Sequence, residues 1–420
     1  MKEQNSTHKL RKSLKYCNNK LKSLLDITLA INSNLPISKL LSFYYKILVK
    51  ELNIPKFVLF WHYKNKWRVI IKSHVDKSEY EKINVEKDLI RFKDIEIVLS
   101  HSDLNISFDF IIPIKQHSKT VAFLLIGDIS EGLGISPSLK NLQFVQTLTN
   151  IIIVAIQNRI LVLKAIKEEQ MKKEMETAAE IQKMLIPNKE DYPKVSGLSV
   201  EGFYLPHFEV GGDFYDIIKI SKNEYFFVIA DVSGKGVSAA LLMANLQANL
   251  RSLVYNKNKT NIEELIIELN RIVNKIADGD RFITMFIAKY NALKGRLIYV
   301  NAGHPAPLLY NSRTKNIREL TEGCPGIGML KHIENIKVGK IKIKTKSKLL
   351  CFTDGFYEPL LINEKTAKII KDILKSPISI EDTVASIVKN LNISRENKIF
   401  NDDVSILGIE FSPFFSWTNF

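Results

Sequence analysis

The sequence contains little cysteine and no long apolar run. Its three cysteines, Cys17, Cys324 and Cys351, have no paired spacing, which excludes a thiolate metal site and a disulfide framework and is typical of a reducing cytoplasm. The first residues are too polar for a signal peptide. We find no stretch that approaches the roughly 18 apolar residues of a membrane span. These absences predict a cytoplasmic protein without a membrane span.

Acidic residues are scarce relative to basic ones, and the formal net charge is +15. The basic excess is concentrated in residues 1–50 and 331–350. Over 340–346 lysine alternates with isoleucine or threonine, which predicts a strand with one solvent face, and lysines also protect an exposed sheet edge from mispairing. No zinc-finger, helix-turn-helix or aromatic RNA-binding pattern accompanies the lysines. We therefore expect solvated faces and no nucleic-acid partner.

The first third of the chain predicts an α+β domain. Residues 1–20 form a basic segment, irregular or in a short helix, and residues 21–155 form the domain. Helical spacing continues to about residue 52, with a break at Pro36. Strands are predicted at 57–63, 67–73, 95–100, 108–115 and 120–129, and a closing helix at 141–160. This order resembles a GAF sensor domain, with a PAS-like fold as the alternative. The sensed ligand stays open, because the Asn-Lys-Phe-Asp-Glu string of cyclic-nucleotide-binding GAF domains is absent.

Residues 156–187 predict one long helix that ends at Pro187. Apolar residues recur mostly every three or four positions, and charged residues fill the other faces. Such a narrow stripe favours a two-stranded coiled coil, and hence a homodimer. A helix packed on its own domain is the alternative. The stripe consists of Ile156, Ile160, Leu163, Ile166, Met171, Met175, Ala178, Ile181 and Leu185.

Residues 188–412 predict a second unit, followed by a tail at 413–420. Many short strands and a few long helices indicate two sheets sandwiched between helices, an α-β-β-α arrangement. The predicted strands are 198–204, 216–220, 225–231, 282–290, 296–302, 308–310, 340–346, 348–353 and 404–410, and the predicted helices are 238–255, 261–276, 364–374 and 380–391.

Four acidic clusters lie at the ends of predicted strands in this second unit. They are Gly211-Gly212-Asp213-Phe214-Tyr215-Asp216, Asp231-Val232-Ser233-Gly234-Lys235-Gly236, Asp354-Gly355-Phe356-Tyr357-Glu358 and Asn401-Asp402-Asp403-Val404-Ser405. Carboxylates at strand ends can converge on one pocket, and hard oxygen ligands suit Mg²⁺ or Mn²⁺. Such a pocket can hold two metals that activate water against a phosphate ester. The clusters predict a metallohydrolase.

An ordered set of motifs then identifies a family. Residues 175–412 resemble a PPM-type metal-dependent serine/threonine phosphatase of the SpoIIE and RsbU-like bacterial branch. The motifs are residues 179–187, 210–216 and 230–243, then Phe282-Ile283-Thr284-Met285-Phe286, Asn301-Ala302-Gly303-His304-Pro305, Gly326-Ile327-Gly328, Thr353-Asp354-Gly355 and Asp402-Asp403-Val404-Ser405.

The resemblance implies a site with two Mn²⁺ or Mg²⁺ ions. Asp231 is expected to bridge both ions and the Val232 carbonyl to ligate one, while Asp354 and Asp402 complete the ligands. Asp213 is expected to be a metal ligand or to hold metal-bound waters at the rim of the pocket. Asp403 beside Asp402 is the alternative ligand.

Other residues receive simpler interpretations. Asp216, Asp278 and Asp280 are expected to be structural, and His304 is expected to fix a turn rather than act as an acid. Ser233 stands where animal relatives carry a candidate proton-donating histidine, and Lys235 is the nearby cation. No general acid is assigned.

The resemblance also implies regulation and a partner. The substrate is expected to be a phosphoprotein, such as a STAS-type anti-sigma-factor antagonist, and an unknown signal acts at the GAF-like domain. The expected regulatory helix includes Met175, Ala178, Ile181, Gln182 and Leu185. The alternative is an inactive phosphatase-fold regulator that acts by binding partners.

Overall fold

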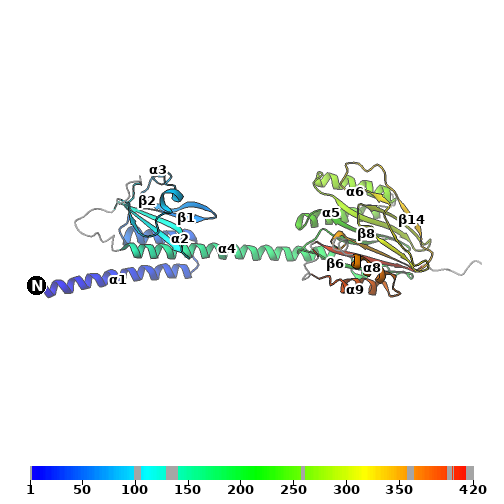
Figure 1. The fold of residues 1–420 in the computed structure, drawn as a ribbon, viewed down its shortest axis with the longest axis horizontal. Coiled ribbons are helices and arrows are strands. Elements are labelled where there is room, and N and C mark those ends of the chain that lie inside the picture. Colours follow the sequence, from blue (N-terminus) through cyan, green and yellow to red (C-terminus); the bar gives the residue numbers. More distant parts are fainter. Residues whose placement is uncertain are drawn as a thin grey trace, which may run out of the picture. The chain divides into compact units, whose positions relative to one another are not determined.

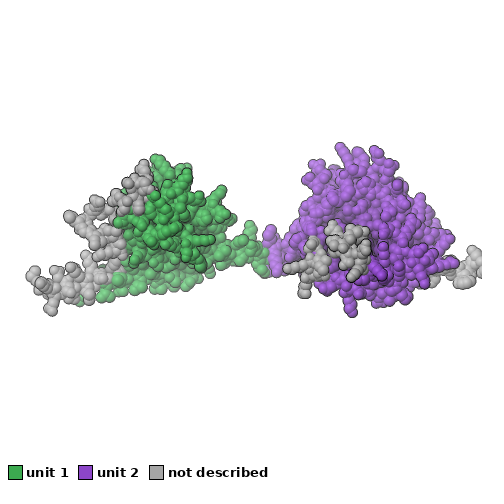
Figure 2. Space-filling view, viewed as in Figure 1, with its two compact units in different colours: residues 1–170 green, residues 171–420 purple. Residues whose placement is uncertain are grey.

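The computed structural model describes residues 2–98, 106–128, 141–256, 261–356, 364–394, 400 and 402–412. The chain divides into two compact units, residues 1–170 and residues 171–420 (Figure 2). Helix α4 (Leu142–Leu185) begins in the first unit and ends in the second. The helices predicted at 141–160 and 156–187 are therefore one continuous helix of 44 residues.

The first unit begins with two helices. Helix α1 spans Lys2–Asn32, and helix α2 (Ile37–Lys46) continues into the short π-helical turn η1 (Ile47–Glu51). Pro36 precedes α2 in an extended conformation, which confirms the predicted break. Residues 2–20, expected to be irregular or in a short helix, are part of α1, because no glycine or proline interrupts the helix before Pro36.

An antiparallel sheet follows in the order β2-β1-β5-β4-β3. The predicted strands are observed, although the third is shorter than expected; residues 99 and 100 of the third predicted strand and residue 129 of the fifth lie outside the described part of the chain. The bounds are β1 Lys56–Tyr63, β2 Lys66–Ser73, β3 Glu96–Ile97, β4 Phe110–Gln116 and β5 Lys119–Gly127, with α3 (Lys77–Tyr80) and η2 (Val85–Leu89) between β2 and β3.

Both faces of this sheet are covered. Side chains from α1, α2 and α4, including Ile27, Tyr44 and Ile152, form a core with one face. On the other face, Val75, Leu89 and neighbouring residues of the β2–β3 connection form a second core with the sheet. The first unit is thus an α+β domain with helices packed against its sheet.

Helix α4 carries more apolar sequence than we expected. An 18-residue window within Leu142–Asp191 has a mean hydropathy of 1.5, and by length and composition the helix is able to cross a membrane, contrary to the prediction that no such stretch exists. Only 28% of the window is buried. The same composition also suits a core helix, since Val145, Leu148, Ile152 and Ile156 are buried in the first unit.

The second unit contains two sheets between two layers of helices (Figure 1). One sheet has the order β13-β10-β9-β8-β7, with β14 also paired to β10, and the other has the order β12-β11-β15-β16-β6. The first sheet contains β7 (Phe214–Ser221), β8 (Glu224–Val232), β9 (Ile283–Asn291), β10 (Arg296–Ala302), β13 (Gly323–Cys324) and β14 (Gly339–Lys342). The second contains β6 (Leu198–Leu205), β11 (Leu308–Asn311), β12 (Ile317–Glu319), β15 (Ser347–Phe352) and β16 (Val404–Phe411).

Helices cover the outer faces of both sheets. Helices α5 (Val237–Tyr255) and α6 (Ile262–Ala277) pack against the first sheet, and α8 (Glu364–Lys375) and α9 (Ile380–Asn390) lie on the second. A shared core between the sheets includes Phe227, Phe286, Leu349 and Leu407. The predicted α-β-β-α order of layers is therefore observed. The predicted strand over 340–346 is shorter and ends at Lys342; the Ile343 N–H still donates to the carbonyl of Gly295, where the partner strand β10 gives way to the β9–β10 turn.

Candidate metal-binding active site

The first acidic cluster spans the loop before β7 and the first residues of that strand. Asp213 is 1% exposed, and its Oδ2 accepts a hydrogen bond of 2.6 Å from the Thr353 hydroxyl. Thr353 follows β15 directly and precedes the half-buried Asp354. This hydroxyl therefore joins the ends of two different sheets and places two of the predicted site residues on either side of the junction.

The predicted carboxylates lie close enough to repel one another. The pKa of the Asp231 carboxyl is raised to about 7, by burial first and next by the negative charge of Asp354. Asp402 and Asp403 raise it further, and a hydrogen bond with Asp213 lowers it. Burial, followed by the charge of Asp231, raises the pKa of Asp213 well above its usual range. Clustered carboxylates of this kind favour either a bound proton or a bound cation.

Asp402 and Asp403 have different surroundings. Asp403 is 8% exposed; its Oδ1 accepts from the backbone N–H of His207 at 2.8 Å and its Oδ2 from that of Gly212 at 2.6 Å. Asp402 is more exposed, and its Oδ2 lies 2.7 Å from Nζ of Lys235. Asp403 thus holds the loop that precedes Asp213, whereas Asp402 presents its carboxylate to a cation.

Glycines bring the segments of the site into contact. A Cβ atom at Gly211 would overlap the Asp403 carboxylate, and one at Gly355 would overlap the Asp403 carbonyl oxygen. A Cβ at Gly212 would lie 2.9 Å from the Val232 carbonyl oxygen. Only glycine permits this approach, which brings the carbonyl expected to ligate a metal against the first acidic loop.

The donor set suits a hard divalent cation. Its members are carboxylate and carbonyl oxygens, the ligands that Mg²⁺ and Mn²⁺ prefer. Among the described residues, no three His, Cys, Asp or Glu side chains already surround one metal position. The excess negative charge around Asp231 and the Lys235–Asp402 ion pair nevertheless mark the place where a cation would be stabilised. The residues fit a metal of this class.

Arg281 fixes the turn from β8 into α5, and no motif in the sequence marks it. Its Nη1 donates to the Ser233 carbonyl at 2.7 Å, and its Nη2 donates to the Ser238 hydroxyl at 2.9 Å. Gly234 has φ 93°, and a Cβ there would overlap the guanidinium. Ser233 also exchanges two hydrogen bonds of 2.9 Å with the backbone of Phe282. The segment before β9 thus holds the loop that follows Asp231.

The end of α4 is hydrogen-bonded to the same region. Gln182 is 6% exposed; its Nε2 donates to the Gly211 carbonyl at 2.7 Å and its Oε1 accepts from the Gly211 N–H at 3.0 Å. Gln247 of α5 donates to the Leu185 carbonyl at 2.7 Å. Of the other residues expected in the regulatory helix, Met175, Ala178 and Leu185 are half-buried and Ile181 is 59% exposed.

Asp216 has a structural environment, as expected. It is fully buried, and Arg251 donates to both of its oxygens, from Nε at 2.7 Å and from Nη2 at 2.8 Å. Gln247 donates to the same carboxylate at 3.2 Å. Asp278 and Asp280 are exposed after α6, away from any such network.

His304 lies in a turn, as expected, and the side chain of Asn301 holds that turn. The backbone N–H of His304 donates to Asn301 Oδ1 at 2.7 Å, and the Asn301 amide donates back to the His304 backbone carbonyl at 2.9 Å. Its Nδ1 lies 3.0 Å from the Thr284 hydroxyl. Burial lowers the pKa of His304 to about 3, so the ring stays neutral near neutral pH.

Comparisons with known proteins agree with this architecture. Residues 221–412 match the family described as stage II sporulation protein E (SpoIIE). Phosphoserine phosphatase RsbU of Bacillus subtilis (strain 168) is 33% identical over 153 residues, which cover 36% of this chain and 44% of RsbU. Phosphoserine phosphatase RsbP of the same organism is 27% identical over 235 residues, which cover 55% of this chain and 56% of RsbP. The SiaA-PP2C domain of Pseudomonas aeruginosa has 17% identity and a TM-score of 0.51, over 59% of this chain and 100% of that domain, a likeness of fold alone.

Residues 221–412 of this chain are therefore similar to the SpoIIE family, and part of the chain is similar to the phosphoserine phosphatases RsbU and RsbP. The chain spans about half the length of the curated relatives it matches. The matched range begins after Asp213, so the placement of that residue rests on its contacts with Thr353 and with the other carboxylates.

Proposed function

We propose that this chain is a metal-dependent protein serine/threonine phosphatase. One observation supports the proposal: Asp213, Asp354 and Asp402, from three other segments of the chain, lie close enough to Asp231 to shift the pKa of its carboxyl, at the ends of the two sheets of the second unit. The names of the relatives RsbU and RsbP, both phosphoserine phosphatases, support the reaction class.

We assign Asp231, Asp354, Asp402 and the Val232 carbonyl to hold two Mg²⁺ or Mn²⁺ ions, with Asp213 at the rim. When bound, the ions would supply the water activation and charge neutralisation that phosphate-ester hydrolysis needs. The protein's part is positioning. Thr353 orients the Asp213 carboxylate, and the backbone contacts of Asp403 hold the loop beside it.

The proton on the leaving hydroxyl has no assigned donor. His304 is buried, and the lowered pKa of its ring keeps it neutral near neutral pH, so it carries no proton to donate as a cation. Ser233 Oγ accepts from a backbone N–H, and Lys235 is paired with Asp402. These contacts favour proton delivery by solvent rather than by a dedicated side chain.

The first unit and α4 form the regulatory part of the proposal. The α+β unit is proposed as a GAF-like sensor of an unknown signal, and the exposed middle of α4 as a coiled-coil seam in a homodimer. Gln182 links that helix to the loop of Asp213 through Gly211. A signal that moves the helix end would therefore alter the acidic loop.

The proposed substrate is a phosphoserine or phosphothreonine protein in the cytoplasm, such as a STAS-type anti-sigma-factor antagonist. This part rests on the family resemblance and on the relatives. A regulator that only binds its partners is the second candidate, and the complete set of carboxylates disfavours it.

Hydrolysis of a generic aryl phosphate by the full chain tests the proposal. We expect turnover that requires Mn²⁺ or Mg²⁺ and that Asp231→Asn or Asp354→Asn abolishes, because each change removes a negative charge from the cation site. Asp280→Asn, at an exposed loop position, is the matched control. Near-normal turnover of Asp231→Asn and Asp354→Asn at saturating metal would refute the two-metal assignment.

A further inference from the structure

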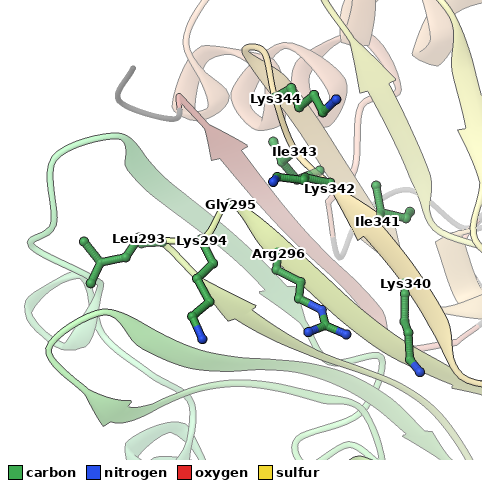
Figure 3. Close-up of a pocket in the computed structure, with 10 residues that line it drawn as sticks. Leu293, Lys294, Gly295, Arg296, Lys340, Ile341, Lys342, Ile343 and Lys344 are labelled. Atoms are coloured by element: carbon green, nitrogen blue, oxygen red, sulfur yellow. The ribbon is translucent and has the colours of Figure 1, made fainter. Parts of the chain in front are cut away.

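A basic hollow lies beside the β9–β10 turn and β14. It has a volume of about 670 Å³. Figure 3 shows Lys294, Arg296 and Lys340 extending from the turn and the strands to the same side. Its cationic lining consists of Lys294, Arg296, Lys340, Lys342 and Lys344. A neighbouring hollow of about 360 Å³ shares the first three and adds Lys289. The proposed phosphatase chemistry uses none of these basic side chains.

The sheet register places like charges face to face. Arg296 is directly opposite Lys342 in the β10–β14 ladder, and the next outward position pairs Ile298 with Lys340. Directly opposed like charges destabilise an antiparallel pair. In the part of the chain that the structure describes, no carboxylate forms an ion pair with any of the five cations, whereas Glu224 at the neighbouring hollow pairs with Lys289 at 3.8 Å. An anionic ligand would relieve this repulsion.

The hollow is separate from the carboxylate site. In the β8–β9 ladder, Val232 pairs with Ile283 at the catalytic end and Glu224 pairs with Asn291 at the other end. Strands of this length extend roughly 3.3 Å per residue, so the two ends are on the order of 25 Å apart. A ligand in the hollow therefore does not occupy the position of the reacting phosphate.

Three features favour a polypeptide as the ligand. Strand β14 pairs with β10 on one side, and the described residues provide no strand partner on its other side. The lining has no aromatic ring on which a nucleobase would stack. It is also recessed and includes aliphatic groups, among them Leu293, which is 79% exposed. An extended peptide supplies backbone groups for the free edge and side chains for the hollow.

We propose that this hollow and the edge of β14 bind an extended acidic segment of a protein partner, with carboxylates at alternate positions over Lys340, Lys342 and Arg296. The site is independent of the phosphatase reaction. The competing explanation is that the lysines only protect the edge from self-association.

Fluorescence anisotropy with the full chain tests the proposal. The probe is a short labelled peptide of alternating Glu and Val, compared with its Gln-Val counterpart. We expect the acidic peptide to bind, the neutral one to bind at least about tenfold more weakly, and added salt to weaken the acidic complex. The double variant Lys340→Glu/Lys342→Glu is expected to lose binding, while Lys371→Glu/Lys375→Glu on exposed positions of α8 keeps it.

Aryl-phosphate turnover is measured in the same samples. Because the hollow lies far from the carboxylates, we expect turnover of the Lys340→Glu/Lys342→Glu variant to match that of the unmodified chain. Equal peptide affinity in the two double variants would overturn the proposal. If the unmodified chain binds no peptide and the Lys340→Glu/Lys342→Glu variant self-associates, the lysines protect the edge of β14 and the proposal is wrong. Tighter binding of the unmodified chain to anionic vesicles or to random DNA than to the peptide would also refute a polypeptide ligand.

Discussion

The side-chain amide of Gln182 makes two hydrogen bonds with the backbone of Gly211, at 2.7 and 3.0 Å. One amide thereby satisfies both the donor and the acceptor of a buried glycine. Gly211 is separated from Asp213 by Gly212 alone, and Asp403 accepts from the N–H of Gly212. The acidic loop is therefore held from one side by the helix and from the other by the segment before β16.

Replacing Gln182 tests whether the helix controls the site. In Gln182→Leu the buried N–H and C=O of Gly211 lose their partners, at a cost of about 1–3 kcal/mol for each group. We expect the loop to loosen, and turnover and Mn²⁺ affinity to fall by about tenfold, since 1.4 kcal/mol corresponds to a factor of ten. Lys183→Leu, at the adjacent exposed position, is the control. Equal values in the two variants would show that the helix is only a tether.

We expect substitutions of the neighbouring residues Asp402 and Asp403 to have different effects. Asp403→Ala removes the acceptor for three backbone N–H groups, those of His207, Gly212 and Asp213, and should lower the unfolding temperature. Asp402→Asn keeps these bonds and should lower metal affinity and turnover while the unfolding temperature stays near that of the unmodified chain. Calorimetry and a Mn²⁺ titration of both variants check this. The opposite pattern would make Asp403 the ligand.

Without divalent metal, stability should fall as the pH rises toward neutrality. The pKa of Asp231 is raised to about 7 in the folded chain, and that of Asp213 is also raised. Between the ordinary carboxyl pKa of about 4 and pH 7, the native state thus holds more protons than the unfolded chain, and the free energy of unfolding decreases with pH. Unfolding temperatures in EDTA from pH 5 to 8 measure the slope. Asp231→Asn, which cannot titrate, should reduce it; an unchanged slope would contradict the prediction.

Arg281 is expected to act by positioning the turn after Asp231. Arg281→Ala removes both hydrogen bonds to the turn and should lower turnover by at least about tenfold. Arg281→Lys should recover part of the lost turnover, because a lysine ammonium can replace one of the two hydrogen bonds but cannot make both as the guanidinium does. Arg271→Ala, which breaks an exposed pair with Glu268, is the control. If Mn²⁺ affinity and turnover stayed normal in Arg281→Ala, the turn would need no such support.

The exposed middle of α4 tests the dimer. Leu163 and Ile166 are both exposed, whereas Ile160 packs against the core of the first unit and is unsuitable for substitution. Leu163→Lys/Ile166→Lys should convert a dimer to monomers in sedimentation at micromolar concentration, because it places like charges in an apolar seam. Leu161→Lys/Val162→Lys, outside the stripe, should leave the dimer intact. If the unmodified chain sediments as a monomer, the proposed dimer is wrong.

Patterns in the sequence predicted the helices and the longer strands of the second unit, because alternation and helical spacing are local properties, but they missed the short strands β12 and β13. The same reasoning placed Asp213 and Asp231 at strand ends, where the structure has them. Adjacency in sequence did not distinguish Asp402 from Asp403, since the difference lies in contacts with Gly212 and His207, roughly two hundred residues away. Arg281 was missed for the same reason: its partners follow β8, far back in the chain.

The pairing of β6 with β16 has a consequence for how the protein is made. Strand β6 opens the second unit and β16 closes it, and the two are neighbours in one sheet. During synthesis, β6 leaves the ribosome long before its partner exists. The loop before Asp213 likewise lacks its hydrogen-bond acceptor until Asp403, which immediately precedes β16, has been synthesised. Nascent chains that lack this last strand therefore cannot complete the carboxylate cluster, and any hydrolytic activity must appear only when synthesis of the unit is nearly finished.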